Sequence, residues 1–281
     1  MNFAQPQPLQ AVAAPVSRHR RPVLGPALYD LPELAEANEA LLSGVLERLE
    51  PLGVSRAACT RSAAPVWSRL LLGQVGGYRY MKRLSDLVRP IATPRYRVEG
   101  ADGPFNRSAV LVRAGDPAGG LADLRSRALA LSDRDPDSGN LLRAEAALLA
   151  RGGAFFDSVA HRPSFEGPIA AVAAGEADAA LVDGVALAQL RRLRPSLLKG
   201  LRVLLWTPRA PGPPLISALA LEPRLATGVA GALVEAARDP GLKWARDELL
   251  ITGFDRLEPA QYRAVLHFEQ IAETLGYSEL R

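Results

Sequence analysis

The spacing of apolar residues predicts the strands and helices in the first third of the chain. An apolar run at 22–29 predicts a first strand, and leucine and valine residues at helical spacing over 34–49 predict a helix. A second apolar run at 66–72 ends in a glycine-rich turn, and 79–88 has the pattern of a short helix. Residues 1–20, rich in proline, glutamine and alanine, predict a disordered tail.

The middle third of the chain alternates between strand and helix patterns. Short apolar runs at 109–112, 128–131 and 179–182 predict buried strands, and the amphipathic stretches between and after them predict helices. Such alternation is typical of a parallel sheet with crossover helices. A further strand is predicted at 202–208, and 222–281 is mostly helical in pattern.

Two stretches rich in proline and glycine interrupt this pattern, at 92–108 and at 209–215. We interpret them as crossovers between two α/β lobes, each a mostly parallel sheet flanked by helices. The predicted division assigns 21–98 and 203–281 to the first lobe and 99–202 to the second. Two crossovers form a natural hinge, because a ligand bound between the lobes would favour their closure.

Composition and charge narrow the classes of function. The net charge of +4 is modest for 281 residues, and basic residues form no stripe with interleaved aromatics, so no nucleic-acid partner is predicted. The single cysteine, Cys59, excludes a disulfide within the chain and a cysteine-based metal site. His19, His161 and His267 lie far apart without ligand spacing, so we expect neither a metal nor a cofactor.

The amino-terminal segment does not have the pattern of a signal peptide. Its basic residues follow a short apolar patch instead of preceding it, and no run of about 18 apolar residues predicts a membrane span. The sequence as written therefore predicts a cytoplasmic protein without a membrane span. A true start codon further upstream would instead allow export to the periplasm.

Ser138, Gly139 and Asn140 lie between a predicted strand and a predicted helix, where a ligand site is plausible on physical grounds. The start of a helix exposes unpaired N–H groups and the positive end of its dipole, and a glycine lets the backbone approach a ligand closely. The alternative is that Ser138 or Asn140 only caps the helix. The aspartates just ahead of Ser138 are expected to point into solvent, away from a bound anion.

Three further stretches have the same character. His161 and Ser164 precede a predicted helix, Asp183 ends a predicted strand, and a turn rich in small residues follows the run at 66–72. Simple caps and turns are the alternative in each place. Enzyme signatures such as G-x-S-x-G, the P-loop, G-x-G-x-x-G and H-E-x-x-H do not occur in the sequence.

The order of these pieces resembles the phosphonate-type substrate-binding proteins of ABC transporters, within the type II periplasmic-binding-protein superfamily. The resemblance covers roughly 22–275 and rests on "ALYDLPELAEANEALL", "LLLGQVGGYRYMKRL", "ATPRYRVEGADGPFNRSAVLVR", "DPDSGNLLRAEAALLA" and "IAAVAAGEADAALVDGVALAQLRR". It implies a non-catalytic, two-lobed protein that holds a phosphonate, phosphate or similar oxyanion between its lobes. The ligand-binding residues that it implies are Tyr29, Gln74, Gly76, Gly77, Tyr78, Ser108, Ser138, Gly139, Asn140, His161, Ser164 and Asp183.

The sequence departs from the family pattern at Val75, Gly76, Asn106 and Ala160, where the family often has residues with more hydrogen-bonding groups. The resemblance implies a monomer that delivers its ligand to an ABC permease. Asp183 would select a protonated oxyanion over sulfate. Two alternatives remain open on the same fold: a small-molecule enzyme of the cofactor-biosynthesis kind, and a cytoplasmic ligand sensor.

Overall fold

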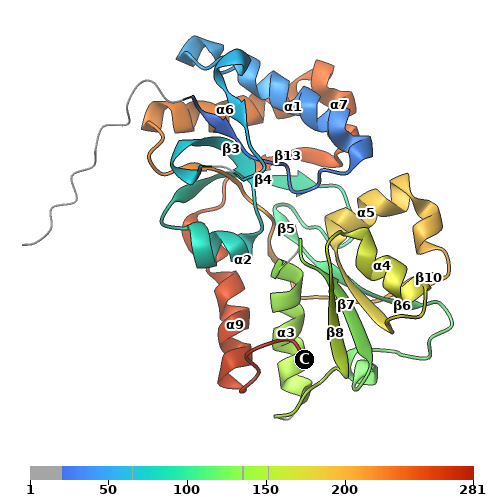
Figure 1. Cartoon of the computed structure of the whole chain (residues 1–281). Coiled ribbons are helices and arrows are strands. Elements are labelled where there is room, and N and C mark those ends of the chain that lie inside the picture. The colour runs from blue at the N-terminus through green and yellow to red at the C-terminus, as the bar shows by residue number, and fades with distance from the viewer. Residues whose placement is uncertain (1–20, 65, 135, 151) are drawn as a thin grey trace, which may run out of the picture.

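The computed structural model describes residues 21–281 except Pro65, Asp135 and Arg151 (Figure 1). The predicted tail at 1–20 and the question of an export signal lie outside the described residues. The described chain folds into two α/β lobes, which stand one above the other in Figure 1. None of the described helices is both long enough and apolar enough to cross a membrane.

The first lobe is built on a six-stranded sheet with the strand order β13-β4-β12-β3-β1-β2. At one end of this sheet β1 pairs in parallel with β2 and β3, whereas β12, β4 and β13 join in antiparallel pairs. The strands are β1 (Val23–Leu24), β2 (Thr60–Arg61), β3 (Leu70–Gln74), β4 (Val88–Tyr96), β12 (Leu215–Ala218) and β13 (Ile251–Asp255).

Helices α1 (Ala35–Glu47), α6 (Pro223–Arg238) and α7 (Lys243–Glu248) cover the first sheet. Helix α6 packs on the sheet because its buried residues recur about every three or four positions, which places them on one apolar face of the helix. A short helix α2 (Gly77–Arg79) follows β3 and continues as a π-helical turn (Tyr80–Leu84). Short 3-10 turns occur at Pro32–Leu34, Glu50–Leu52, Arg56–Ala58, Trp67–Arg69, Leu121–Leu124, Pro195–Leu198 and Pro240–Leu242.

The second lobe is built on a five-stranded sheet with the order β10-β6-β9-β7-β8. Strand β7 pairs in parallel with β8 and β9, and β6 pairs antiparallel with β9 and β10. The strands are β6 (Ser108–Arg113), β7 (Ala128–Ser132), β8 (Ser158–Arg162), β9 (Ala179–Asp183) and β10 (Leu201–Trp206). The helices are α3 (Pro136–Ala150), α4 (Glu166–Ala173) and α5 (Gly184–Leu193).

Two crossovers join the lobes, as the sequence predicts, and they pair with each other. Strand β5 (Phe105–Asn106) in the first crossover pairs antiparallel with β11 (Ala210–Pro211) in the second. The predicted two-lobed α/β fold is confirmed. The sheets are mixed instead of mostly parallel, because the strands beside the crossovers run against the parallel strands of each lobe.

The pattern of residues predicted the second lobe better than the edges of the first. Strands β6, β7, β9 and β10 lie where apolar runs predicted them. Strand β4 was interpreted partly as a crossover, because Pro90 and Pro94 interrupt it, yet it pairs on both sides. Strands β8, β12 and β13 were not predicted: β8 and β13 contain polar residues and lack a clear apolar run, whereas β12 lies in an apolar run at 215–221 that was left unassigned after the proline-rich stretch.

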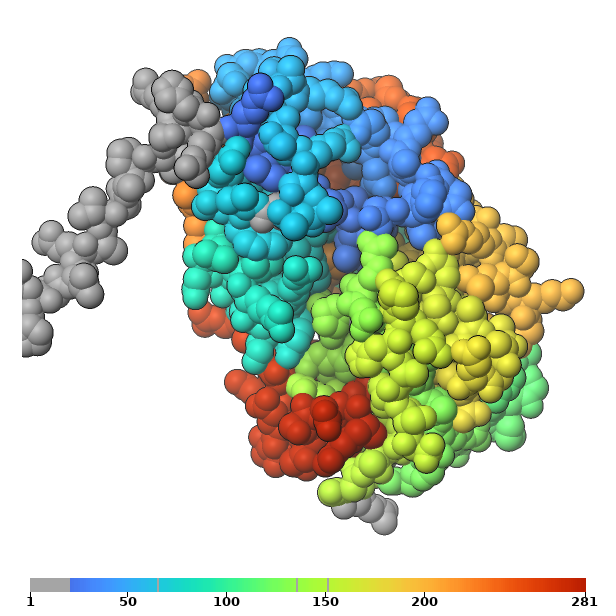
Figure 2. Space-filling view, in the orientation of Figure 1, coloured from blue at the N-terminus to red at the C-terminus, as the bar shows by residue number. Residues whose placement is uncertain are grey.

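The carboxyl-terminal segment packs on the second lobe, although the predicted division placed all of 203–281 in the first. Helix α8 (Pro259–Tyr262) leads into α9 (Ala264–Thr274), which lies beside α3. Ala272 and Tyr277 belong to the apolar core of the second lobe, and the Phe155 N–H donates to the Arg281 carbonyl at 2.7 Å. The final residues therefore lie against second-lobe segments in Figure 2.

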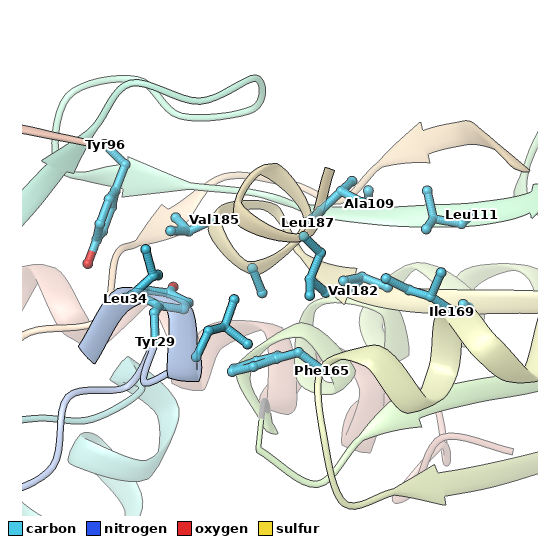
Figure 3. Packing of buried hydrophobic residues seen from close by; sticks show 14 of the residues in the cluster. Tyr29, Leu34, Tyr96, Ala109, Leu111, Phe165, Ile169, Val182, Val185 and Leu187 are labelled. Carbon is cyan, nitrogen blue, oxygen red and sulfur yellow. The ribbon is translucent and has the colours of Figure 1, made fainter. Parts of the chain in front are cut away.

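The lobes contact each other through a shared apolar cluster. Tyr29 and Leu34 of the first lobe meet Phe165 and Val185 of the second, with ring centroids of Tyr29 and Phe165 5.9 Å apart (Figure 3). Arg134 reaches from the second lobe to the first. Its guanidinium donates to the Leu28 carbonyl at 3.0 Å and to the Asp30 carboxylate at 2.5 Å, and it stacks on Phe165. The structure is thus a closed arrangement of the lobes.

An ion pair at the rim of this contact makes closure dependent on pH. Glu33 of the first lobe accepts two hydrogen bonds from Arg194 of the second, at 2.7 and 2.9 Å. Arg194 lowers the pKa of Glu33 from 4.5 to about 2. The pair therefore stabilises the closed arrangement fully above about pH 4.5, and this stabilisation is lost as the pH falls from there through about 2.

We expect a modest opening of the lobes on acidification, since both side chains are partly exposed to solvent and such pairs are weak. Small-angle scattering between pH 6 and pH 3 measures it as a rising radius of gyration. Glu33→Gln, which has no carboxylate to protonate, should be more open at pH 6 and should respond less. An identical response in the variant would assign the opening to other groups.

Candidate functional site

A small chamber lies between the two lobes, with a volume of about 30 Å³. This is room for about one water molecule. Its lining includes Gly76, which lies just before α2, and Asn106 in the first crossover. The second lobe adds Ser108, Ser138 and Asp183 to the lining. Five different segments thus meet at one point, so small relative movements of the lobes change what the chamber holds.

Ser138 and Ser108 form the hydroxyl wall of the chamber. Ser138 is 2% exposed and lies in the first turn of α3, and Ser108 is 4% exposed at the start of β6. Their Oγ atoms are hydrogen-bonded to each other. The first turn of a helix carries N–H groups without intrahelical acceptors and the positive end of the dipole. This wall therefore offers hydroxyl groups and a favourable potential to an anion.

Asn106 also lines the chamber, and its side-chain amide has no hydrogen-bond partner among the described residues. Its side chain is only 7% exposed, and neither its amide oxygen nor its amide nitrogen has a hydrogen-bond partner among the described residues. Buried polar groups nearly always have partners, so an unpaired amide in a residue that lines a cavity needs an explanation. A ligand oxygen in the chamber would provide one. Sequence reasoning noted Asn106 only as a departure from the family pattern, without assigning it a role.

Asp183 caps a helix, which is one of the two roles that the sequence left open, and it also lines the chamber. Its Oδ1 accepts a hydrogen bond from the Ala186 N–H at 2.8 Å, which caps helix α5. The residue is 8% exposed and also lines the chamber. A carboxylate at this position lies within reach of a hydrogen-bond donor on a bound ligand.

Asp137 lies in the site, where the sequence predicted a solvated aspartate pointing away. Its Oδ1 accepts a hydrogen bond from the Tyr78 N–H at 3.1 Å, so it bridges α3 and α2 across the lobes. A β-carbon on Gly76 would come within 2.5 Å of the same oxygen, which is closer than real contacts allow. Only glycine fits at position 76 while this carboxylate is in place. The prediction for the aspartate at 137 was therefore wrong.

A wider groove adjoins the chamber on its outer side, with a volume of about 710 Å³. Both are lined by Leu28, Gly76, Arg134 and Pro136. The groove's charged side chains are predominantly basic: Arg79, Lys82, Arg83 and Arg134, with the one acidic residue Asp133. The groove is therefore positively charged and leads toward the chamber.

The floor of this groove contains a hydrogen-bonded group around Glu269. Glu269 accepts from the Tyr78 hydroxyl at 2.6 Å and from the Lys82 ammonium at 2.8 Å. Burial, and then the Glu269 carboxylate, raises the pKa of Tyr78 to about 12. Tyr78 is therefore a neutral hydroxyl near pH 7. Within the described part of the chain, Arg79 and Arg83 are not engaged in ion pairs, so their charge faces the groove.

Gln74 and Tyr29 have structural partners of their own. The Gln74 amide donates to the Tyr96 hydroxyl at 3.1 Å and to the Pro213 carbonyl at 3.2 Å, so Gln74 ties β3 to the second crossover. Gln74 and Tyr78 line the groove and not the chamber. Tyr29 belongs to the apolar cluster between the lobes.

Gly139 and Asn140 face away from the chamber because helix α3 starts earlier than predicted. The helix begins at Pro136, so residues 138 and 140 are about 200° apart around its axis. The Asn140 amide donates to the Val265 carbonyl of α9 at 2.7 Å. Gly139 is directed toward Leu131 in the sheet.

His161 and Ser164 also lie apart from the chamber and the groove, and Gly77 lines neither. Strand β8 places His161 at the edge of the sheet, where its Nδ1 is 2.9 Å from Oδ1 of Asp133. Ser164 Oγ accepts from the Gly167 N–H at 3.2 Å, as a helix cap does. No group of three or more potential metal ligands occurs in 21–281 outside the three undescribed positions.

The two lobes, the paired crossovers and the chamber between them define the class of type II periplasmic binding proteins. Within that class, residues 72–262 match the family model described as ABC transporter, phosphonate, periplasmic substrate-binding protein. The chain belongs to this family, as its sequence resemblance implied. It is therefore a solute-capturing protein of the ABC-uptake type.

Solved structures share this fold at low sequence identity. XAC2383 from Xanthomonas citri bound to ATP has a TM-score of 0.68 and 19% identity, covering 92% of this chain and 99% of that one. PhnD1 from Prochlorococcus marinus in complex with methylphosphonate has a TM-score of 0.69 and 16% identity, with 89% and 97% covered. A binding protein of an ABC phosphonate transporter from Pseudomonas aeruginosa has a TM-score of 0.69 and 15% identity, and the match covers 91% of this chain and 88% of that one. A sequence comparison with curated proteins finds no match.

Proposed function

We propose that the protein captures a small phosphorus oxyanion, such as a phosphonate or phosphate, in the chamber between its lobes. The observation that carries the proposal is that Asn106, whose buried amide has no partner among the described residues, lines the chamber together with the two serines. An oxyanion satisfies this set of groups: it accepts from the amide nitrogen, from both hydroxyls and from N–H groups at the start of α3.

The groove gives the anion a route to the chamber. Its arginines and lysine attract an anion from solution and guide it inward. Asp183 then accepts a hydrogen bond from a protonated oxygen of the ligand. A hydrogen phosphate or hydrogen phosphonate has such a proton near neutral pH, and sulfate does not, so Asp183 favours the phosphorus oxyanion.

Binding requires the lobes to separate and the Asp137 carboxylate to move. The chamber of about 30 Å³ is smaller than any phosphonate, which has at least five heavy atoms. Asp137 also occupies the Tyr78 N–H that an oxyanion at α2 would use. We therefore expect the ligand to enter an open form, displace this carboxylate, and then favour closure around itself.

The ligands in two similar structures fit this proposal. Methylphosphonate and ATP, bound to PhnD1 and XAC2383, share a tetrahedral phosphorus group with negatively charged oxygens. The groove, at about 710 Å³, leaves room for a substituent on that group.

The remaining roles follow the family. We propose a monomer without catalytic activity that delivers its ligand to an ABC permease, and that works in the periplasm, where members of the family act. A fusion of the full gene to alkaline phosphatase, which folds actively only after export, tests the compartment. Activity of that fusion in cells supports export, and inactivity of a stable fusion contradicts it.

Thermal denaturation with a panel of anions tests the proposed ligand class. A ligand that binds only the folded protein raises the melting temperature in proportion to the logarithm of its concentration. Methylphosphonate and phosphate should raise it, and sulfate at equal ionic strength should not. The proposal fails if no phosphorus oxyanion shifts the melting temperature at millimolar concentration, or if sulfate shifts it equally.

A further inference from the structure

We propose that the first lobe holds a second binding site, for an uncharged aliphatic molecule, beneath helix α1. A cavity of about 470 Å³ lies between α1 and the sheet of this lobe. It is lined from β1, β3, β4, β12 and β13, so it extends across most of the sheet. The cavity adjoins the basic groove at Gly73 and Gln74, and Gln189 of the second lobe also lines it. It shares no lining residue with the oxyanion chamber, and the proposal goes beyond the capture of an anion.

The walls of the cavity are aliphatic and aromatic on both sides. One side is the inner face of α1, and the other is formed by strand residues and by α6. The side chains that determine its character are Leu41, Leu42, Val45, Leu215, Ile251 and Phe254. Burial of apolar surface is the main source of affinity that such walls offer to a ligand.

Two amide side chains that line the cavity already donate to backbone carbonyls of the protein. The Asn38 amide donates to the Tyr29 carbonyl at 3.2 Å, and the Gln189 amide donates to the Glu248 carbonyl at 3.2 Å. A charged ligand would therefore lose its hydration without gaining partners, which is unfavourable. The interior thus selects an uncharged molecule.

The rim of the cavity is polar and lies at the surface. Glu39 binds the guanidinium groups of Arg56 and Arg61 there, and Asp30 lies across the opening. Charged groups at the rim and apolar groups inside suit a molecule with an aliphatic body and a small neutral polar end, such as an alcohol.

The size of the cavity suits a small molecule. About 470 Å³ would take about fifteen water molecules at roughly 30 Å³ each, but apolar walls offer such waters few partners. The volume lies in the range of small-molecule sites, roughly 300–1,000 Å³.

The neutral fluorophore N-phenyl-1-naphthylamine tests the proposal, because its emission rises in an apolar site. The full chain should bind it saturably with one site per molecule, and decan-1-ol should displace it. Leu215→Phe and Leu42→Phe fill the cavity from its two sides, and each should weaken the binding at least tenfold. Leu148→Phe, on the exposed face of α3, is the matched control and should bind as the native protein does.

Two control measurements test whether a loss of fluorophore binding comes from the cavity itself. Melting curves should show that the cavity-filling variants fold, since an added ring in a void costs little, whereas an added ring in a packed core destabilises. Methylphosphonate should not displace the fluorophore, which separates this site from the chamber. The proposal is overturned if the fluorophore does not bind saturably, or if folded Leu215→Phe and Leu42→Phe both bind it with unchanged affinity.

Discussion

Asp137→Asn will bind methylphosphonate at least tenfold more tightly than the native protein. The Asp137 carboxylate accepts the Tyr78 N–H and lies against Gly76, at the wall of the chamber. Two unit charges about 6 Å apart repel by roughly 3 kcal/mol at an effective dielectric constant of about 20. Asparagine removes this repulsion and keeps an oxygen that can accept the same hydrogen bond, and a gain of tenfold corresponds to about 1.4 kcal/mol.

Isothermal titration calorimetry measures this change. Asp157→Asn is the matched control: it removes the same charge from an exposed residue at the start of β8, remote from the chamber. The control should change the affinity less than twofold, because exposed charges at such a distance are screened. If Asp137→Asn binds no more tightly than Asp157→Asn, then Asp137 does not compete with the ligand.

Ser138→Ala will weaken the binding of methylphosphonate by about tenfold or more. Ser138 lines the chamber together with Asn106, so a bound oxyanion would accept a hydrogen bond from the Ser138 hydroxyl. Hydrogen bonds to charged groups typically contribute about 1.5–3 kcal/mol. Because Ser138→Ala also removes the buried hydrogen bond between the Ser138 and Ser108 hydroxyls, the variant should lose some stability, on the order of 1 kcal/mol.

Ser164→Ala separates these two effects. Ser164 caps α4 through the Gly167 N–H, but it lines neither the chamber nor the groove. It should lose a similar amount of stability and retain the native affinity. Calorimetry and melting curves on both variants give the comparison, and native affinity in folded Ser138→Ala would show that this serine only supports the helix.

The fold was predictable because local patterns determine most of it. Apolar runs separated by amphipathic stretches produce β6, β7 and β9 with their helices, and breakers mark the crossovers. Strand β4 was partly hidden, since Pro90 and Pro94 have the local character of a loop. Its position depends on two partner strands from the distant end of the chain, which no local pattern reveals.

Residues of the candidate site could be predicted from the sequence only where a single local segment determines their position. Ser138 was found because a hydroxyl near the start of a helix has a local signature, but the start of α3 was placed too late, so Asn140 was expected on the wrong side of the helix. Asn106 and Asp137 were not assigned as site residues. Their roles depend on how two lobes face each other, which is a matter of contacts between residues far apart in the sequence.

Helix α9 and the residues after it complete the second lobe late in synthesis. Ala272 and Tyr277 are translated long after the strands of that lobe, yet they close its core around residues such as Leu142 and Phe155. All strands of that lobe have been translated by Trp206, so its sheet keeps part of its apolar surface uncovered until α9 has been synthesised. The second lobe therefore cannot complete its folding during synthesis before α9 has been translated, as a continuous domain could. A nascent or truncated chain that ends before Ala264 would leave this surface open to chaperones and proteases.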